Sequence, residues 1–401
     1  MFTPSQKKQF MVYFGIFLMA LVIHFCFWFG YYQGRPGTSS DFVHQLDPNA
    51  RQLVEYLRGN IVLSAISFEH PLGVIAHFNW LIFVSLMYFF FGLGNVTAII
   101  VFQIIAVSLV TVLFFKITLR HYRSRVIAFV FTFISMVFID NISWNLWAST
   151  ECFYRILFFV FYYYLLQLFF IKKNYKYFSL VFFISFFILV FTRIDTIILY
   201  LPFYILLIGL GVKYLRLRIK LIIAAAVIGL FSWIILSFDL SAARMLTLGS
   251  VEKFYKDGIV VHFYRFIEPF DNTMSGNYLY LFSRWIKLWF YRAYEFFNLM
   301  PYRWSNIHKL QYAFFMIIFY FFSFFALLRM FRNKDYHFLF FFLVYVSSAI
   351  MHIFLFGVTA DLRTTFTHVP FLILTAGYGC DYLFSLFKDK KDRPNGDFYR
   401  S

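Results

Sequence analysis

Long apolar runs, separated by short polar intervals, make up most of this chain. Runs of roughly 20 apolar residues are long enough to cross a bilayer as helices. The pattern predicts about ten membrane-spanning helices, at residues 10–32, 96–117, 126–138, 152–171, 178–191, 197–212, 221–238, 310–328, 338–356 and 369–387. We therefore expect an all-α, polytopic membrane protein with a single transmembrane domain over residues 1–401.

One apolar segment, Leu72 to Leu93, does not fit a simple alternation of crossings. It contains His77 and Asn79 and ends without a basic flank, whereas the next run ends in a cluster of four cations, Lys116, Arg120, Arg123 and Arg125. Basic clusters stay in the cytoplasm. If Leu72 to Leu93 crossed the membrane fully, this cluster would lie outside. The segment is therefore expected to be re-entrant or interfacial.

The composition excludes a soluble globular protein, because the chain is 62% hydrophobic and only 14% charged. Soluble domains are about a quarter charged. Under the predicted topology the inner face carries 21 basic and 5 acidic residues and the outer face 15 and 14, which gives net charges of +16 and +1. Such an excess marks the cytoplasmic side. Both termini are therefore expected to be cytoplasmic, and the net charge of +17 requires no nucleic-acid partner.

Most of the acidic residues, 14 of 19, fall on the predicted outer face, so any chemistry is expected there. The first external loop, residues 33–71, holds Asp41, Asp47 and His70. Within it, Asn49 to Arg58 has the spacing of a short amphipathic helix, which would lie on the membrane surface. Asp47 is the expected N-cap of that helix, with Pro48 as its first residue.

A second long external loop covers residues 239–309. In it, Leu281 to Met300 interleaves aromatic and cationic residues, as expected of an interfacial helix. Residues 310–401 hold the last spans and a cytoplasmic tail. The three cysteines fit no metal or redox spacing. Polar residues inside the spans are expected to make interhelical hydrogen bonds, namely His24, Gln103 and His352.

Several short motifs, taken in order, resemble one enzyme family. They are an external Asp before a surface helix ending in Gly59, Glu69-His70-Pro71-Leu72, Ser149-Thr150-Glu151-Cys152-Phe153-Tyr154, Thr192-Arg193, and Asp361-Leu362-Arg363 with Pro370. Together they resemble the polyprenyl-phosphate-dependent glycosyltransferases of the C-type fold. That family includes the dolichyl-phosphate-mannose protein mannosyltransferases and the aminoarabinose transferase of lipid A. The resemblance covers residues 1–215 and 361–382.

The resemblance implies an integral, multi-pass enzyme of a bacterial plasma or inner membrane. It would transfer a sugar from a polyprenyl-phosphate-linked donor to a hydroxyl of a glycan, lipid or protein acceptor on the outer face, in cell-surface glycan or glycolipid synthesis. Residues 1–238 would form the glycosyltransferase-like helical module. Besides these substrates, the expected partners are membrane lipids.

The acceptor hydroxyl in such a reaction is a poor nucleophile and needs a carboxylate base. Asp41 is the first choice, because it stands in the first external loop. Asp47 is a second candidate base, although an Asp before Pro is also a common helix cap. Glu151 could orient the base, bind the acceptor or hold a divalent cation, the one cofactor considered, or cap its own helix.

The leaving lipid phosphate gains negative charge and needs cations. Arg193 and Arg363 stand at predicted outer helix ends, where a lipid phosphate would lie. Asp195 is close enough in sequence to pair with Arg193. His70 would bind phosphate or serve a structural role, and the sequence does not rank the two.

Two alternative functions stay open. An O-antigen or capsule repeat-unit polymerase also needs long external loops with arginine, which the segment 239–309 provides. A flippase or other transporter of lipid-linked sugars should carry ionisable residues near the bilayer midplane. Because the predicted spans are nearly free of charge and the acids gather at one surface, the sequence favours an enzyme.

Overall fold

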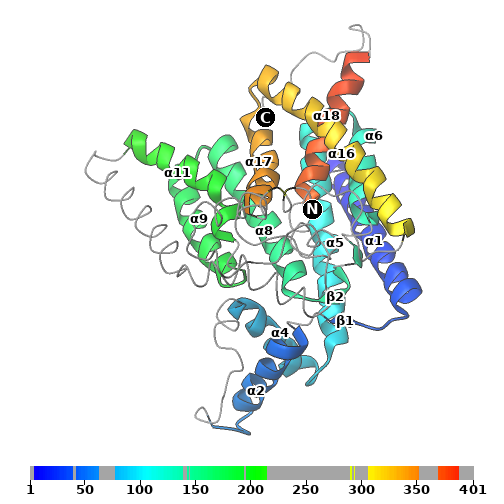
Figure 1. Cartoon of the computed structure of the whole chain (residues 1–401), viewed down its shortest axis with the longest axis vertical. Helices are drawn as coiled ribbons and strands as arrows, with labels where there is room; N and C mark the ends of the chain where they lie inside the picture. Colours follow the sequence, from blue (N-terminus) through cyan, green and yellow to red (C-terminus); the bar gives the residue numbers. More distant parts are fainter. Residues whose placement is uncertain are drawn as a thin grey trace, which may run out of the picture.

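The described part of the chain is almost entirely helical (Figure 1). The computed structural model describes residues 4–38, 42–62, 77–138, 142–143, 145–193, 196–214, 290, 293, 306–351 and 369–387. Its helices are α1 (Pro4–Tyr32), α2 (Asp47–Leu57), α4 (Phe78–Phe91), α5 (Val96–His121), α6 (Arg125–Val137), α8 (Thr150–Leu166), α9 (Tyr175–Val190), α10 (Thr196–Leu199), α11 (Leu201–Tyr214), α16 (Asn306–Asn333), α17 (Tyr336–Met351) and α18 (Val369–Phe387).

Five helices in the described part of the chain are long and apolar enough to cross a membrane: Gln6–Tyr32, Val96–His121, Thr150–Ile171, Asn306–Asn333 and Val369–Phe387. The third of these joins α8 to a π-helical turn, η3 (Gln167–Ile171). The all-α class expected of a membrane protein is therefore confirmed. The predicted span 221–238 lies outside the described residues, as does the predicted interfacial helix 281–300 apart from Phe290 and Ala293.

Short polar side chains fix where several helices begin. Asn95 Oδ1 accepts a hydrogen bond from Ala98 N at 3.1 Å at the start of α5. Ser124 does the same for α6, accepting from Ile127 N at 3.4 Å, and Asn174 for α9. Each side chain satisfies one of the backbone N–H groups that a helix leaves unbonded at its N-terminus. Ser124, the N-cap of α6, follows the last residue of α5 by three positions, so the α5–α6 turn is short.

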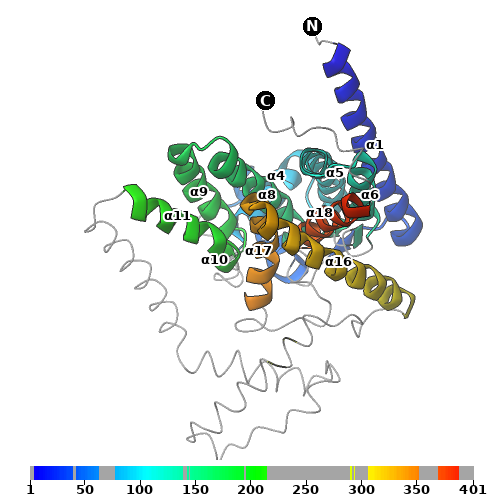
Figure 2. The same cartoon turned by 90° about the horizontal axis from the view of Figure 1, so that it is seen from above.

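The bundle core forms where α16 and α18 pack against each other, with α5, α6 and α17 around them (Figures 1 and 2). Gly379 lets the backbones of α16 and α18 approach, since a Cβ there would overlap the carbonyl oxygen of Phe322. Small residues allow such close packing inside membranes. Aromatic side chains fill the space farther out: the Phe338 and Tyr378 rings stack with centroids 4.0 Å apart.

A second, smaller core lies at one end of the bundle, where α2 packs on α4 (Figure 1). A two-residue parallel pair, β1 (Gly37–Thr38) with β2 (Trp147–Ala148), joins this end to the bundle. The π-helical turn η1 (Phe42–Leu46) runs directly into α2. We call the group formed by α2 and α4 the outer subdomain, because α2 lies in the predicted first external loop and α4 in the adjoining segment that is predicted to be re-entrant or interfacial.

The prediction that Asp47 caps α2 is wrong. The helix begins at Asp47 itself, Leu46 is already in the right-handed helical region, and no side chain forms a cap hydrogen bond there. The physical reason is the preceding π-helical turn. Because the chain is helical before Asp47, carbonyl groups of that turn precede the first amides of α2 and no separate N-cap is required. The Asp47 side chain is left to bind elsewhere.

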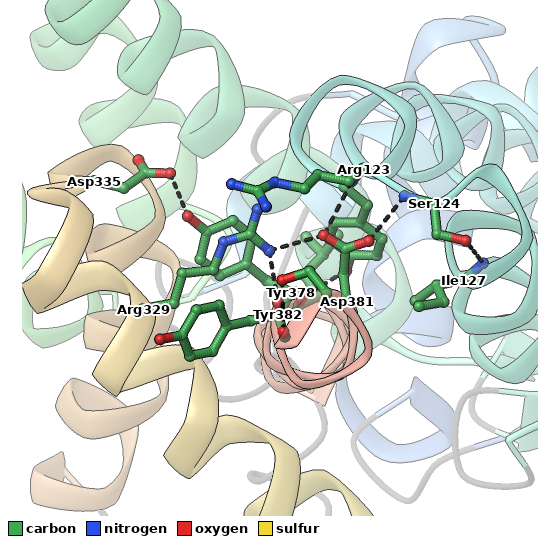
Figure 3. A network of polar contacts seen from close by, with 11 residues as sticks. Arg123, Ser124, Ile127, Arg329, Asp335, Tyr378, Asp381 and Tyr382 are labelled. Carbon is green, nitrogen blue, oxygen red and sulfur yellow. Dashed lines mark hydrogen bonds and ion pairs between the residues drawn. The ribbon is translucent and has the colours of Figure 1, made fainter. Parts of the chain in front are cut away.

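At the opposite end, Asp381 of α18 ties three segments together (Figure 3). Its carboxylate accepts hydrogen bonds from the backbone N–H groups of Arg123 at 3.0 Å and Ser124 at 2.8 Å. It also forms an ion pair of 2.8 Å with Arg329 of α16. Tyr378 adds a fourth point, because its hydroxyl donates to Asp335 in the α16–α17 turn at 2.7 Å.

Loops that the charge pattern assigns to the same side of the membrane lie together at the same end of the molecule. Asp381 joins the α5–α6 turn to the ends of α16 and α18, all of them assigned to the basic, inner side. At the other end, Trp147 donates to the Tyr32 hydroxyl at 3.0 Å, and both residues were assigned to the outer side. The contacts group the segments, while which group faces the cytoplasm stays the prediction made from the basic clusters.

Candidate functional site

Glu151 and Arg193 meet where α8 begins and α9 ends. The Glu151 Oε1 and Arg193 Nη1 atoms lie 3.1 Å apart, and the side chains are 5% and 15% exposed. Glu151 stands in the first turn of α8, where the helix dipole stabilises a negative charge. The sequence singled out both residues separately and did not predict that they pair; it offered Asp195, which lies outside the described residues, as one partner for Arg193.

Hydroxyl groups and a ring surround the arginine. The Arg193 guanidinium lies over the Tyr154 ring, 5.8 Å from its centroid. The Thr196 hydroxyl donates to the Arg193 carbonyl at 2.7 Å and lies 2.8 Å from the Tyr154 hydroxyl. These contacts hold the turn between α9 and α10 against the first turns of α8. The arginine is thus positioned from both its backbone and its side chain.

The start of α4 contacts the end of α9 just before Arg193. Asn79 donates through its side chain to the Ile188 carbonyl and, at 3.3 Å, to the Thr192 hydroxyl. His77 Nδ1 lies 3.0 Å from the Thr192 carbonyl oxygen. Both residues come from the segment predicted to be re-entrant. They place the N-terminus of α4 directly beside the residue that precedes Arg193.

Asp47 occupies a different place, at the far end of α4. Its Oδ2 accepts from Arg51 Nε at 2.9 Å and its Oδ1 from the Tyr88 hydroxyl. The hydrogen bond that Arg51 donates to Asp47 is the main cause that raises the pKa of Arg51 above its usual value. Tyr88 lies nine residues beyond Asn79, which is about 14 Å along a helix. The described contacts therefore do not bring Asp47 to the Glu151–Arg193 pair.

A third polar group lies inside the bundle. The Arg155 guanidinium donates to Asn145 Oδ1, and Asn145 Nδ2 lies 2.8 Å from His24 Nε2. His24 Nδ1 lies 2.7 Å from the Ala20 carbonyl oxygen and must donate to it. The other ring nitrogen is then the acceptor, which fits the Asn145 amide. The prediction that His24 makes an interhelical hydrogen bond is confirmed.

These three residues line a cavity of about 40 Å³ together with Thr111, Ser135 and Pro370. A cavity of this size has room for only a few water molecules. Sequence reasoning passed over Arg155 and Asn145. The signal was present, since Arg155 lies four residues after Glu151 and hence on the same face of α8.

Four predicted site residues lie outside the described residues: Asp41, His70, Asp195 and Arg363. Their assignments stay predictions. Within the described ranges, no group of three His, Cys, Asp or Glu side chains is arranged to hold a metal ion. The divalent cation considered at Glu151 therefore stays a prediction as well, and Arg193 is one charged group that lies next to that carboxylate.

Comparison with known proteins gives no relative of this chain: no protein family, no curated protein and no solved structure matches it.

Proposed function

We propose that the chain is an integral membrane glycosyltransferase that transfers a sugar from a polyprenyl-phosphate-linked donor to a hydroxyl acceptor at the outer face of the membrane. The observation that carries the proposal is the Glu151–Arg193 pair, which brings a carboxylate and a guanidinium together where α8 begins and α9 ends, 3.1 Å apart and largely buried. Two sequence motifs assigned to the same site, around Glu151 and Thr192-Arg193, meet there in space.

The topology belongs to the same proposal. About ten spans, with α4 as a re-entrant segment, put both termini and the basic loops in the cytoplasm. The α4 helix has 14 residues, or about 21 Å of rise. This is shorter than the hydrocarbon core of a typical bilayer, which is about 30 Å thick. Because α6 has only 13 residues, length alone does not distinguish α4 from a span, and the proposal that α4 is re-entrant rests on the basic cluster that follows α5.

The chemistry divides between two kinds of side chain. Since Asp47 is held by Arg51 and Tyr88, Asp41 stays the proposed general base of the first external loop. Base assistance of this kind is worth about a hundredfold to ten-thousandfold in rate. Glu151 orients the attacking hydroxyl or the base. It also holds Arg193 in place, and Arg193 with Arg363 stabilises the charge that develops on the leaving phosphate.

The test compares glycans and lipid-linked sugars in cells with and without the gene by mass spectrometry, and then assays transfer in purified membranes. We expect the deletion to remove one sugar from a surface glycan or glycolipid and Glu151→Gln to reduce transfer at matched expression. Asp335→Asn, which changes a carboxylate at the opposite end of the bundle, is the control. Unchanged glycans in the deletion strain would refute the proposal.

A transporter of lipid-linked sugars is the second candidate, and one observation favours it. Arg155 and His24 lie inside the bundle beside a cavity, whereas the sequence suggested spans almost free of charge. Ionisable groups within membrane-spanning helices are characteristic of transport pathways. Reconstituted vesicles distinguish the two functions. A transporter moves a labelled lipid-linked sugar between leaflets without any acceptor, while the enzyme consumes the donor only when an acceptor is present.

A further inference from the structure

The last turn of α9 is capped by residues from the start of α4. The Asn79 backbone N–H donates to the Phe191 carbonyl at 3.2 Å, and the Asn79 side-chain amide donates to the Ile188 carbonyl. His77, which precedes α4, lies with its Nδ1 atom 3.0 Å from the Thr192 carbonyl oxygen. A helix leaves its last carbonyl groups without intrahelical partners. Two residues at the start of α4 thus supply donors to the end of α9 and to the turn that follows it.

Thr192 is fully buried and is held through its carbonyl and its hydroxyl. A carbonyl oxygen can only accept, so His77 Nδ1 carries the hydrogen that it donates. The Thr192 hydroxyl donates to the Ile188 carbonyl at 2.8 Å, and its oxygen accepts from the Asn79 amide at 3.3 Å. Both α4 residues therefore bind the residue directly before Arg193, with the donor and the acceptor of each bond defined.

Arg193 depends on this anchoring for the direction of its side chain. Its backbone N–H donates to the Leu189 carbonyl at 2.7 Å, and its carbonyl accepts from the Thr196 hydroxyl at 2.7 Å. From this backbone the side chain reaches Glu151, with Nη1 3.1 Å from Oε1. An arginine side chain is long and has many rotamers, so the place of its guanidinium depends on where its backbone is held. A displacement of about 1 Å at a reacting centre can cost about a hundredfold in rate.

The two ends of α9 are capped in different ways. At its start, Asn174 lies three residues before Tyr177 and accepts from its backbone N–H at 3.3 Å. At its end, the side-chain donors are 109 and 115 positions away in the sequence. A local cap stabilises a helix. A cap from a distant element also fixes where the helix end lies relative to that element.

We propose that Asn79 and His77 are positioning residues that hold Arg193 at the place where its guanidinium meets Glu151. This inference rests on the proposed function, in which Arg193 stabilises the leaving phosphate, and it adds the residues that aim the guanidinium. It also gives a role to the two polar residues that distinguish the segment 72–93 from a simple span. Buried polar groups are costly unless they are hydrogen-bonded, and here both are bonded to the end of α9.

A double-mutant cycle tests the inference without an enzyme assay. The non-additivity of Glu151→Gln and Arg193→Gln in thermal unfolding measures the interaction between the two side chains. We would repeat the cycle in Asn79→Leu, which keeps the size of the side chain but removes its donor. We expect the non-additivity to shrink there, because the guanidinium is no longer held against the carboxylate. Asn174→Ala, which removes the cap at the other end of the same helix, should leave it at the parent value.

His77 provides an independent pair of variants. In His77→Asn, the side-chain amide nitrogen stands the same number of bonds from Cα as Nδ1 and still donates to the Thr192 carbonyl. A leucine at this position has no donor. We therefore expect His77→Asn to keep the parent non-additivity and His77→Leu to reduce it. This pair decides the question if Asn79→Leu does not fold.

Transfer kinetics at matched amounts of folded protein give the second readout. Arg193 is proposed to stabilise charge that develops only in the transition state. Asn79→Leu and His77→Leu should therefore lower kcat by about a hundredfold and leave unchanged the KM for the lipid-linked sugar that accumulates in the deletion strain. His77→Asn should restore most of kcat. Asn174→Ala should leave both constants at the parent values, since a purely structural loss lowers only the amount of folded protein.

The inference is overturned by parent non-additivity in both Asn79→Leu and His77→Leu, by an equal loss in Asn174→Ala, or by a His77→Asn protein that behaves as His77→Leu does. The proposed function fails separately. If the non-additivity falls as expected but the parent protein transfers no sugar from any lipid-linked donor, the positioning stands and the enzyme assignment falls. If the parent transfers sugar while Asn79→Leu and His77→Leu keep its kcat, the enzyme stands and the positioning assignment falls.

Discussion

Arg193 Nη1 lies 3.1 Å from Glu151 Oε1, and only 5% of the glutamate side chain is exposed; Glu151 is in the first turn of α8, whereas Arg193 follows the end of α9. The pair fixes the end of α9 against the start of α8. Removing one partner of a buried pair is far more damaging than replacing both, because a charge is then left without its compensation.

Glu151→Gln and Arg193→Gln should therefore each lower stability by about 3 kcal/mol, and the double variant should lose less than the sum. The measurement is thermal unfolding in detergent for the four proteins of the cycle. Strict additivity of the two single losses would show that the carboxylate and guanidinium do not interact energetically.

Asp41→Asn and Asp47→Asn should have opposite effects. Asp41→Asn should reduce transfer about a hundredfold or more with stability unchanged. Asp47→Asn should keep most activity but lose the ion pair with Arg51, which costs about 1 kcal/mol at a partly exposed site. Transfer assays at matched expression check both. An inactive Asp47 variant beside an active Asp41 variant would reverse the assignment.

Gly379→Ala should destabilise the bundle, because the new Cβ would overlap backbone atoms of Phe322 and approach Ala326 N at 2.6 Å. Backbone cannot move aside as a side chain does, so α16 and α18 must separate. Gly15→Ala in α1 is the control, with nothing within 4 Å of its Cβ. The yield of folded protein by size-exclusion chromatography compares the two; equal yields would contradict the packing argument.

Asp381→Ala should be the most damaging single change at the inner end. It removes the partner of Arg329, whose side chain is 5% exposed, and leaves the amides of Arg123 and Ser124 without their acceptor. We expect a loss of about 3 to 5 kcal/mol. Asp335→Ala, at a partly buried turn, should cost less. Melting temperatures that rank the two variants in the reverse order would refute this.

Cysteine labelling tests the proposed orientation. In a protein without Cys26, Cys152 and Cys380, we would introduce Val62→Cys and Lys172→Cys, both at exposed positions. An impermeant maleimide added outside intact cells should label position 62 and reach position 172 only after lysis. Labelling of position 172 in intact cells would invert the topology and move the candidate site to the cytoplasmic face.

The membrane class and most helix positions follow from the sequence, because an apolar run in a bilayer must satisfy its own backbone hydrogen bonds and does so locally as a helix. The predicted span 369–387 coincides with α18, and 96–117 falls within α5. Caps such as Asn95 are equally local signals. The predicted N-cap of α2 was wrong by one residue. The reason is that nothing in the composition of residues 42–46 predicts a π-helical turn.

The pairing of side chains depends on the tertiary structure. In the sequence, Glu151 and Arg193 are separated by the hairpin of α8 and α9, yet their side chains pair. Asp381, near the C-terminal end of the chain, accepts a hydrogen bond from the backbone N–H of Arg123 in the α5–α6 turn. Such contacts depend on how helices pack against one another, and packing is set by shape at positions such as Gly379 rather than by any local pattern. For the same reason, the sequence identified Arg193 as a cation at a helix end, and only the fold made Glu151 its partner.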